Sequence, residues 1–84
     1  MAKKQKRAKS RRRKMNDVDR RVAVNIKRLR LERGVSQEKL GEALGITFQQ
    51  VQKYESGKNR ITIGRLTDIC DVLDTTLKLV VEKD

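Results

Sequence analysis

SQEKLGEALGITFQQVQKY, residues 36–54, is the stretch that decides how this chain folds. Ser36 is a good helix N-cap, because its hydroxyl can accept a hydrogen bond from an unpaired backbone N–H of the first turn. Gly45 can adopt the positive φ that ends a helix, and Thr47 can cap a second helix. The apolar residues between these caps fall on one helical face, at i, i+3 and i+4: Leu40, Ala43 and Leu44. The stretch therefore predicts two short helices joined by a tight turn.

The outer side of the second helix carries long side chains. Two helices joined by a Gly-containing turn form the helix-turn-helix unit, whose second helix can lie in the major groove of DNA. Val51 is expected in the core, which leaves the outside to Phe48, Gln49, Gln52 and Lys53. Glutamine can pair bidentately with the major-groove edge of adenine. This side of the helix is therefore the predicted DNA-reading surface.

Together these features resemble the phage Cro/repressor-type (XRE-like) helix-turn-helix family. The resemblance covers residues 17–73 and rests on LRLERGVSQEKL at residues 29–40 and YESG at residues 54–57, two motifs that are specific in combination. It implies a compact all-α domain of four to five helices that binds DNA.

The resemblance also assigns roles to single residues. It implies that Gln49 pairs with adenine and that Lys53 meets guanine or a phosphate, whereas Phe48 either contacts a thymine methyl or packs partly in the core. Gln37 matches a family residue that touches the DNA backbone and supports the readers. Gln52 is expected to reach a phosphate or to face solvent. The full set of predicted DNA contacts is Gln37, Thr47, Phe48, Gln49, Gln52, Lys53, Lys58, Asn59 and Arg60.

One charge pair would join the first helix to this unit. In the family, an Arg near the end of the first helix pairs with the Glu that follows the recognition helix, and the matching residues are Arg30 and Glu55. A solvated pair would contribute little to stability. The resemblance favours a pair that pins the two helices together.

Helix signals also flank the central stretch. Asn16 can cap a helix that ends at Gly34, and Thr62 can cap a later helix. The expected core stripes are Val18, Val22, Ile26 and Leu29 in the first of these helices and Ile63, Leu66, Ile69, Cys70 and Leu73 in the second. Cys70 is therefore expected to be a small core residue rather than a reactive thiol. Residues 15–74 are the predicted DNA-binding domain.

The segment 75–84 allows two conformations. Leu77, Val80 and Val81 fit a helical spacing, whereas Leu77, Leu79 and Val81 alternate as in a strand. The β-branched residues favour the strand. A single strand on a helical domain would leave backbone groups unpaired, so we expect it to pair with the same strand of a second subunit. In either conformation this segment is the predicted dimer interface.

Charge is distributed unevenly along the 84 residues. The chain has 22 Lys and Arg against 11 Asp and Glu, a formal net charge of +11, and nine of the basic residues lie in residues 1–14. That run contains no acidic residue and no apolar periodicity, so a disordered basic tail is predicted. Such a tail can lie along phosphates and add salt-dependent affinity for DNA.

Several function classes lack the residues that they need. The chain has no histidine and one cysteine, which excludes the usual zinc ligand sets and an intrachain disulfide. No carboxylate pair or Gly-rich phosphate loop points to catalysis. We therefore predict no enzyme, no cofactor and no metal. The absence of a membrane-spanning run and of a signal peptide predicts a cytoplasmic protein.

The sequence as a whole predicts a transcriptional regulator that binds double-stranded DNA at specific sites. One helix-turn-helix unit covers only a few base pairs, so a homodimer on a near-palindromic operator is expected. A small repressor, able to act on its own promoter, fits this reasoning best. Two alternatives stay open: an antitoxin that binds a toxin as well as its promoter, and a controller protein of a restriction–modification system. The basic tail alone could also coat nucleic acid without sequence preference.

Overall fold

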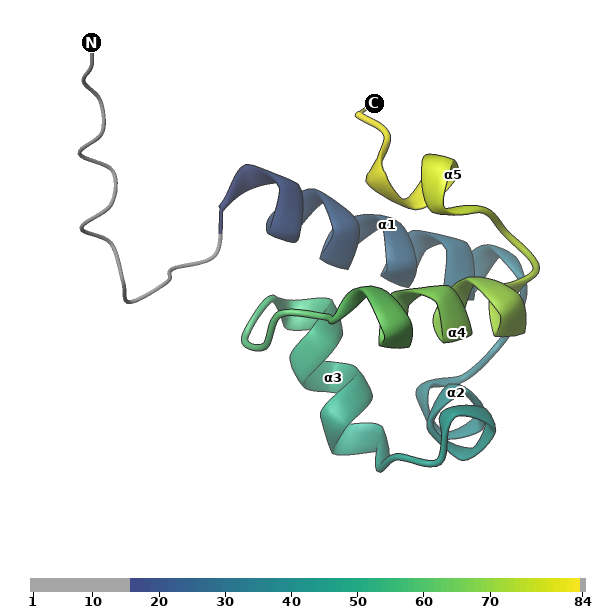
Figure 1. Ribbon diagram of the computed structural model, residues 1–84. Helices are drawn as coiled ribbons and strands as arrows, with labels where there is room; N and C mark the ends of the chain where they lie inside the picture. Colours follow the sequence, from purple (N-terminus) through teal and green to yellow (C-terminus); the bar gives the residue numbers. More distant parts are fainter. Residues whose placement is uncertain (1–15, 84) are drawn as a thin grey trace, which may run out of the picture.

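The computed structural model describes residues 16–83, which fold into five α-helices (Figure 1). The helices are α1 (Asp17–Glu32), α2 (Gln37–Leu44), α3 (Phe48–Ser56), α4 (Ile63–Leu73) and α5 (Leu77–Val81). The prediction of an all-α domain built around a helix-turn-helix unit is confirmed. The predicted basic tail, residues 1–14, lies outside the described residues.

The helix ends follow local capping signals. At the start of α1, Asn16 Oδ1 accepts from the backbone N–H of Asp19 at 2.9 Å, and the Asp19 carboxylate accepts from the backbone N–H of Asn16 at 3.2 Å. This reciprocal pair satisfies two of the N–H groups that a helix start leaves unpaired. The other side-chain caps predicted from the sequence also form, at Ser36, Thr47 and Thr62. Helix α2 ends at Gly45, whose φ is 74°.

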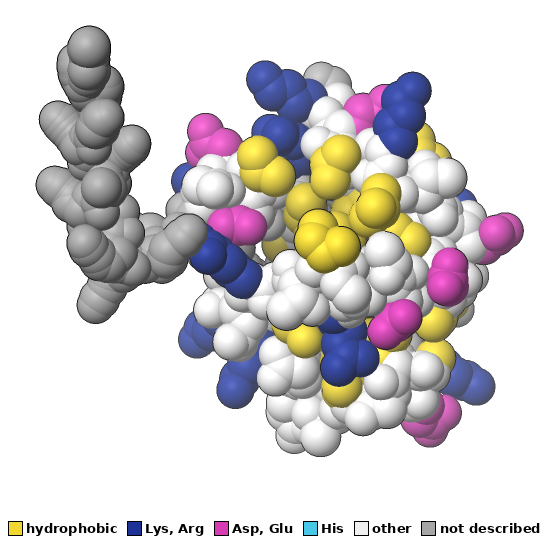
Figure 2. Space-filling view, viewed as in Figure 1, with side chains coloured by type: hydrophobic (Ala, Val, Ile, Leu, Met, Phe, Trp, Pro, Cys, Tyr) yellow, Lys and Arg dark blue, Asp and Glu magenta, His cyan; other side chains and the backbone are white. Residues whose placement is uncertain are grey.

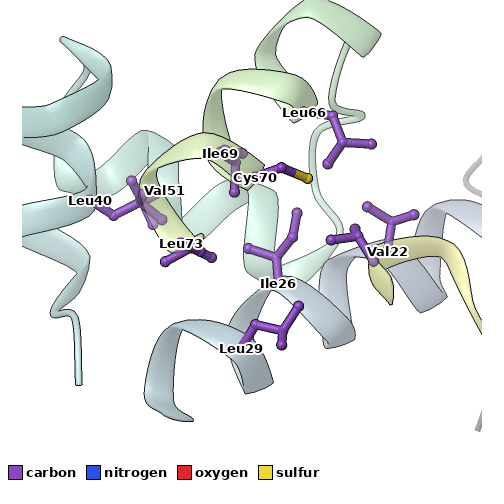
Figure 3. Packing of buried hydrophobic residues seen from close by; sticks show 10 residues of the cluster. Val22, Ile26, Leu29, Leu40, Val51, Leu66, Ile69, Cys70 and Leu73 are labelled. Atoms are coloured by element: carbon purple, nitrogen blue, oxygen red, sulfur yellow. The ribbon is translucent and has the colours of Figure 1, made fainter. Parts of the chain in front are cut away.

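The core lies where α1 and α4 face each other, and Figure 3 shows Leu40 of α2 and Val51 of α3 reaching the same cluster. Its main members are Val22, Ile26, Leu29, Leu40, Val51, Leu66, Ile69, Cys70 and Leu73. Cys70 is buried, as expected, and burial together with the smaller effect of the Asp71 charge raises the pKa of its thiol. The thiol therefore stays protonated and behaves as a small apolar core group.

Three residues of the predicted stripes lie outside the core. Val18 and Ile63 are 47% and 70% exposed, because each sits in the first turn of its helix, beyond the neighbours that cover the later turns. Together with Val81 they line a surface cavity of about 150 Å³. Ala43 is also exposed, because the buried side of α2 is formed by Leu40 and Gly41.

The turn between α2 and α3 depends on a close backbone contact at Gly41. A Cβ at this position would lie 2.8 Å from the carbonyl oxygen of Ile46, closer than real side chains come. The backbone N–H of Ile46 also donates to the Gly41 carbonyl at 2.9 Å. Because Gly41 has no side chain, the backbone that leads into α3 can pack directly against α2.

The C-terminal segment forms a helix, and the prediction of a strand is wrong. Val80 is fully buried. Asn25 Nδ2 of α1 donates to the carbonyl oxygens of Val80 at 2.6 Å and Glu82 at 3.1 Å, and Arg21 Nε donates to that of Val81 at 2.9 Å. A helix end leaves its last carbonyls unpaired. Because α1 supplies these donors, the segment needs no partner strand.

Helix α5 packs on α1 and α4, on the side of the molecule away from α2 and α3 (Figure 1). Its remaining apolar side chains are exposed. Figure 2 shows hydrophobic side chains gathered over α5 and the adjoining parts of α1 and α4. We call this surface the α5 patch; its large apolar residues are Val18, Ile63, Leu77, Leu79 and Val81, each at least 39% exposed.

Candidate DNA interface

Helix α3 has one buried side and one exposed side. Val51 is 1% exposed, and Tyr54 packs against the core. On the other side, Phe48 is 36% exposed, and Gln49, Gln52 and Lys53 are exposed as well. Thr47 stands at the start of this side, where its hydroxyl accepts from the backbone N–H of Gln50 at 3.2 Å. The structure thus brings the predicted reading residues onto one free surface.

The exposed side of α3 borders a shallow hollow, which we call the α3 hollow. It is lined by Gln49, Gln52, Lys53, Ser56 and Lys58. These side chains offer two amides, a hydroxyl and two ammonium groups, without a carboxylate. That combination suits base edges and phosphate oxygens. Sequence reasoning missed Ser56, although its spacing of i+4 from Gln52 and i+3 from Lys53 placed it on the same helical face.

A buried ion pair fixes the C-terminal end of α3 to α1. Arg30 Nε donates to Glu55 Oε2 at 2.7 Å, and Arg30 Nη2 donates to Glu55 Oε1 at 3.0 Å. The side chains are 7% and 3% exposed. Arg30 Nη1 also donates to the carbonyl oxygen of Val35 at 2.8 Å. This bidentate geometry is the strong form of an Arg–carboxylate pair, so the pair fixes the orientation of α3 relative to α1.

Gln37 connects this ion pair to the exposed side of α3. It is the first residue of α2. Its Nε2 donates to Glu55 Oε1 at 3.1 Å, and its Oε1 accepts from Gln52 Nε2 at 3.3 Å. The side chains of both helices of the unit therefore meet in one hydrogen-bonded row.

The loop after α3 divides the remaining predicted contacts. Lys58 and Asn59 are exposed, and Lys58 borders the α3 hollow. Arg60 lies elsewhere: its Nε donates to Asp19 Oδ2 at 3.1 Å, at the start of α1. The side chains of this second ion pair are 36% and 24% exposed. Arg60 thus joins the loop to α1 rather than to the hollow.

Comparison with known proteins agrees with this arrangement. The helix-turn-helix family pattern matches residues 26–80, which contain α2, α3 and α4 in full. The chain belongs to this helix-turn-helix family. Membership confirms the resemblance seen in the sequence and places the chain in a non-enzymatic class of proteins.

Curated relatives carry the name of transcriptional regulators. An uncharacterised HTH-type transcriptional regulator of Sinorhizobium medicae is 48% identical over 69 residues, which cover 82% of this chain and 50% of the relative. A second one, from Sinorhizobium fredii, is 52% identical over 61 residues, which cover 73% of this chain and 43% of the relative. The chain therefore spans about half the length of the curated relatives that it matches.

Two solved structures show the same fold. The clp gene regulator ClgR from Corynebacterium glutamicum matches with a TM-score of 0.74 at 18% identity, over 81% of this chain and 87% of that chain. The restriction–modification controller protein C.Esp1396I, in a tetramer bound to its natural 35 base-pair operator, matches with a TM-score of 0.70 at 25% identity, over 77% of this chain and 86% of that chain.

Residues 16–83 form neither a membrane-spanning helix nor a cluster of metal ligands. None of the helices there is long and apolar enough to cross a membrane. No three His, Cys, Asp or Glu side chains of that region gather where they could hold a metal ion.

Proposed function

We propose that this protein is a cytoplasmic transcriptional repressor that binds a near-palindromic operator in double-stranded DNA as a homodimer. One observation carries the proposal: the exposed side of α3 presents Gln49, Gln52 and Lys53, while its opposite side is fixed by Val51 and by the buried ion pair. The names of the curated relatives support a regulatory role.

In this proposal α3 lies in the major groove, with its N-terminal half against the base edges. Gln49 pairs with the N6 and N7 atoms of adenine, and Lys53 donates to guanine or to a phosphate. Phe48 is exposed enough to meet a thymine methyl. Lys58 and Asn59, at the edge of the same surface, contact the phosphate backbone.

The homodimer is supported by the α5 patch. Leu77, Leu79 and Val81 are 39%, 44% and 39% exposed, and they continue an apolar surface onto α1 and α4. Contiguous apolar patches of this kind often mark protein–protein contacts. Because α5 lies away from α3, pairing through this patch leaves both copies of α3 free to enter half-sites about one helical turn apart.

The decisive experiment selects DNA sites from a random pool with the purified full chain. A near-palindromic motif is the expected result, and binding without any enriched motif would contradict the proposal. Gln49→Ala should then weaken binding to the selected site by about 1–3 kcal/mol and leave binding to random DNA unchanged. An equal loss on both kinds of DNA would remove Gln49 from the set of base readers.

The dimer has a test of its own. Leu79→Glu places a charge in the α5 patch and should shift the protein toward monomer in analytical ultracentrifugation, because a buried unpaired carboxylate is costly. Leu31→Glu is the matched control, since Leu31 is 60% exposed on α1 and lies outside the patch. If both variants stay dimeric, or if the wild type is a monomer on its operator, pairing through α5 is wrong.

A controller protein of a restriction–modification system is the second candidate. The likeness to C.Esp1396I favours it, because that protein forms a tetramer on its operator. Cooperative binding of two dimers to adjacent selected sites, measured by gel shift, would support this form of regulation. Co-purification with a toxin encoded beside the gene would instead support the antitoxin hypothesis.

Residues 1–14 are proposed to add affinity for phosphates. Their deletion should flatten the dependence of the logarithm of the binding constant on the logarithm of salt concentration, by about 0.9 for each phosphate that the segment neutralises. An unchanged slope would show that this segment does not meet DNA.

A further inference from the structure

A row of hydrogen bonds runs from the buried ion pair to the surface of α3. Glu55 Oε1 accepts from Arg30 Nη2 at 3.0 Å and from Gln37 Nε2 at 3.1 Å. Gln37 Oε1 accepts from Gln52 Nε2 at 3.3 Å. Gln52 is exposed and lines the α3 hollow beside Gln49. The row therefore joins a buried charge to the proposed reading surface.

The charge at the buried end decides how each amide in the row is turned. The Glu55 carboxylate, ionised beside Arg30, can only accept hydrogen bonds. Gln37 must therefore present its nitrogen to Glu55, which turns its oxygen toward Gln52. That oxygen also only accepts, so Gln52 must present its nitrogen to Gln37. An isolated amide could be turned by 180° with little change in shape, whereas here each orientation follows from the one before it.

We infer that Gln37 is a positioning residue that makes Gln52 meet DNA with its amide oxygen and one remaining N–H. This inference rests on the proposed function. An outward oxygen can accept from the amino group of adenine or cytosine, and the remaining N–H can donate to adenine N7. The same oxygen is repelled by phosphate oxygens and by the acceptor edge of guanine. Gln52 thus becomes a specificity-determining residue that favours adenine or cytosine.

We expect the fold to tolerate replacement of Gln37, which makes the inference testable. Its bond to Gln52 is exposed, and a single hydrogen bond of this kind contributes little to stability. The two direct bonds between Arg30 and Glu55 do not involve Gln37 and should persist when Gln37 is changed. Effects on base preference can therefore be separated from effects on folding.

Gln37→Lys is the informative variant. The introduced ammonium can still donate to Glu55, but it offers no acceptor to Gln52. Gln52 should then turn its oxygen inward, toward the ammonium, and its NH₂ group outward. At one operator position, selection from a random pool should show the preference change from adenine or cytosine to guanine. The expected ratio of affinities changes by about tenfold, the order of magnitude of one good base contact.

Two further variants identify that position. Gln52→Met should abolish the preference at the same operator position, and Gln49→Ala should relax a different one. The melting temperature of Gln37→Lys should equal that of the wild type, which separates positioning from a purely structural role. An unchanged base preference in Gln37→Lys, or no altered position in Gln52→Met, would overturn the inference while the proposed function stands.

The free protein provides a readout that needs no DNA. The side-chain NH₂ signals of Gln52 in an NMR spectrum should move in Gln37→Lys, because Gln52 no longer has the Gln37 oxygen as its acceptor. Unmoved signals would contradict the orientation argued above. If the wild type selects no DNA motif at all, the proposed function falls, and the role of Gln52 as a reader falls with it.

Discussion

The helix-turn-helix unit and α5 are held in place by different means. Helices α2 and α3 begin at their own caps, Ser36 and Thr47, and their turn rests on the backbone contact at Gly41. Helix α5 has only five residues; it also begins at its own cap, Thr76, whose hydroxyl accepts from the backbone N–H of Leu79 at 3.3 Å. Its last carbonyls take donors from Arg21 and Asn25, which lie 60 and 55 positions earlier in the chain. Short-range signals thus begin all three helices and set the turn between α2 and α3, whereas the end of α5 depends on a surface that exists only after folding.

The largest effect should come from breaking the ion pair that anchors α3. Arg30→Met leaves the Glu55 carboxylate, 3% exposed, without its charged partner, and urea unfolding should show a loss of about 3–5 kcal/mol. Glu32→Gln is the control, because the Arg28–Glu32 pair is about half exposed and should contribute about 0.5 kcal/mol or less. A similar loss in both variants would show that burial of the Arg30 pair is unimportant.

A smaller and more local effect is expected for α5. Asn25→Leu leaves the carbonyl oxygens of Val80 and Glu82 without their donor, at a cost of about 2 kcal/mol. Amide hydrogen exchange should become faster in α5 while α2 and α3 stay protected. Val24→Leu, at the exposed neighbouring position, should change neither. Uniformly faster exchange throughout the molecule would contradict the separation of the two regions.

Two glycine variants should change stability in opposite directions. Gly41→Ala places a Cβ 2.8 Å from the backbone oxygen of Ile46, so the turn must shift at a cost of about 1–2 kcal/mol. Gly64→Ala is the matched control, because nothing lies within 4 Å of the added Cβ, and a better helix former should stabilise α4 by up to about 1 kcal/mol. Thermal unfolding measures both, and a stabilised Gly41→Ala would show that the contact is not tight.

The smallest effect concerns the junction that leads into α5. Asp74 is the C-cap of α4 and has a φ of 54°, a left-handed conformation that costs most side chains energy. Asp74→Gly should raise the stability by about 0.5 kcal/mol, because the relief of strain slightly exceeds the entropy that glycine gains in the unfolded chain. A fall in the melting temperature would mean that the Asp74 carboxylate stabilises the fold.

The sequence predicted well those features whose causes are close in the chain. The caps at Asn16 and Thr62, the helix end at Gly45 and the burial of Val51 all follow from nearby residue types. The conformation of α5 was left open by local signals, because Thr76 and the spacing of Leu77 and Val80 suit a helix whereas the β-branched residues favour a strand. The partners that decide it lie on α1. One signal was available: Asn25 falls on the apolar stripe of α1 between Val22 and Leu29, and a polar residue at such a position needs a buried partner.

The candidate site was predictable in its residue types and only partly in its arrangement. The exposed side of α3 followed from helical spacing, and the Arg30–Glu55 pair from family resemblance. The bond between Gln37 and Gln52 depends on how α2 crosses α3, which no local pattern encodes. The same limit applies to Arg60, since its pairing with Asp19 requires the loop after α3 to return to the start of α1.

The backbone contact at Gly41 has a consequence for protein engineering. Because main chain meets main chain there and Gln49 and Lys53 are exposed, we expect the angle at which α3 leaves the turn not to depend on the side chains at positions 49 and 53. If α3 reads DNA as proposed, a combinatorial library that randomises these two positions should vary the DNA sequence that is read while every member keeps one docking geometry. The domain can serve as a scaffold on which the exposed side chains of α3 are exchanged, provided that Gly41 is kept.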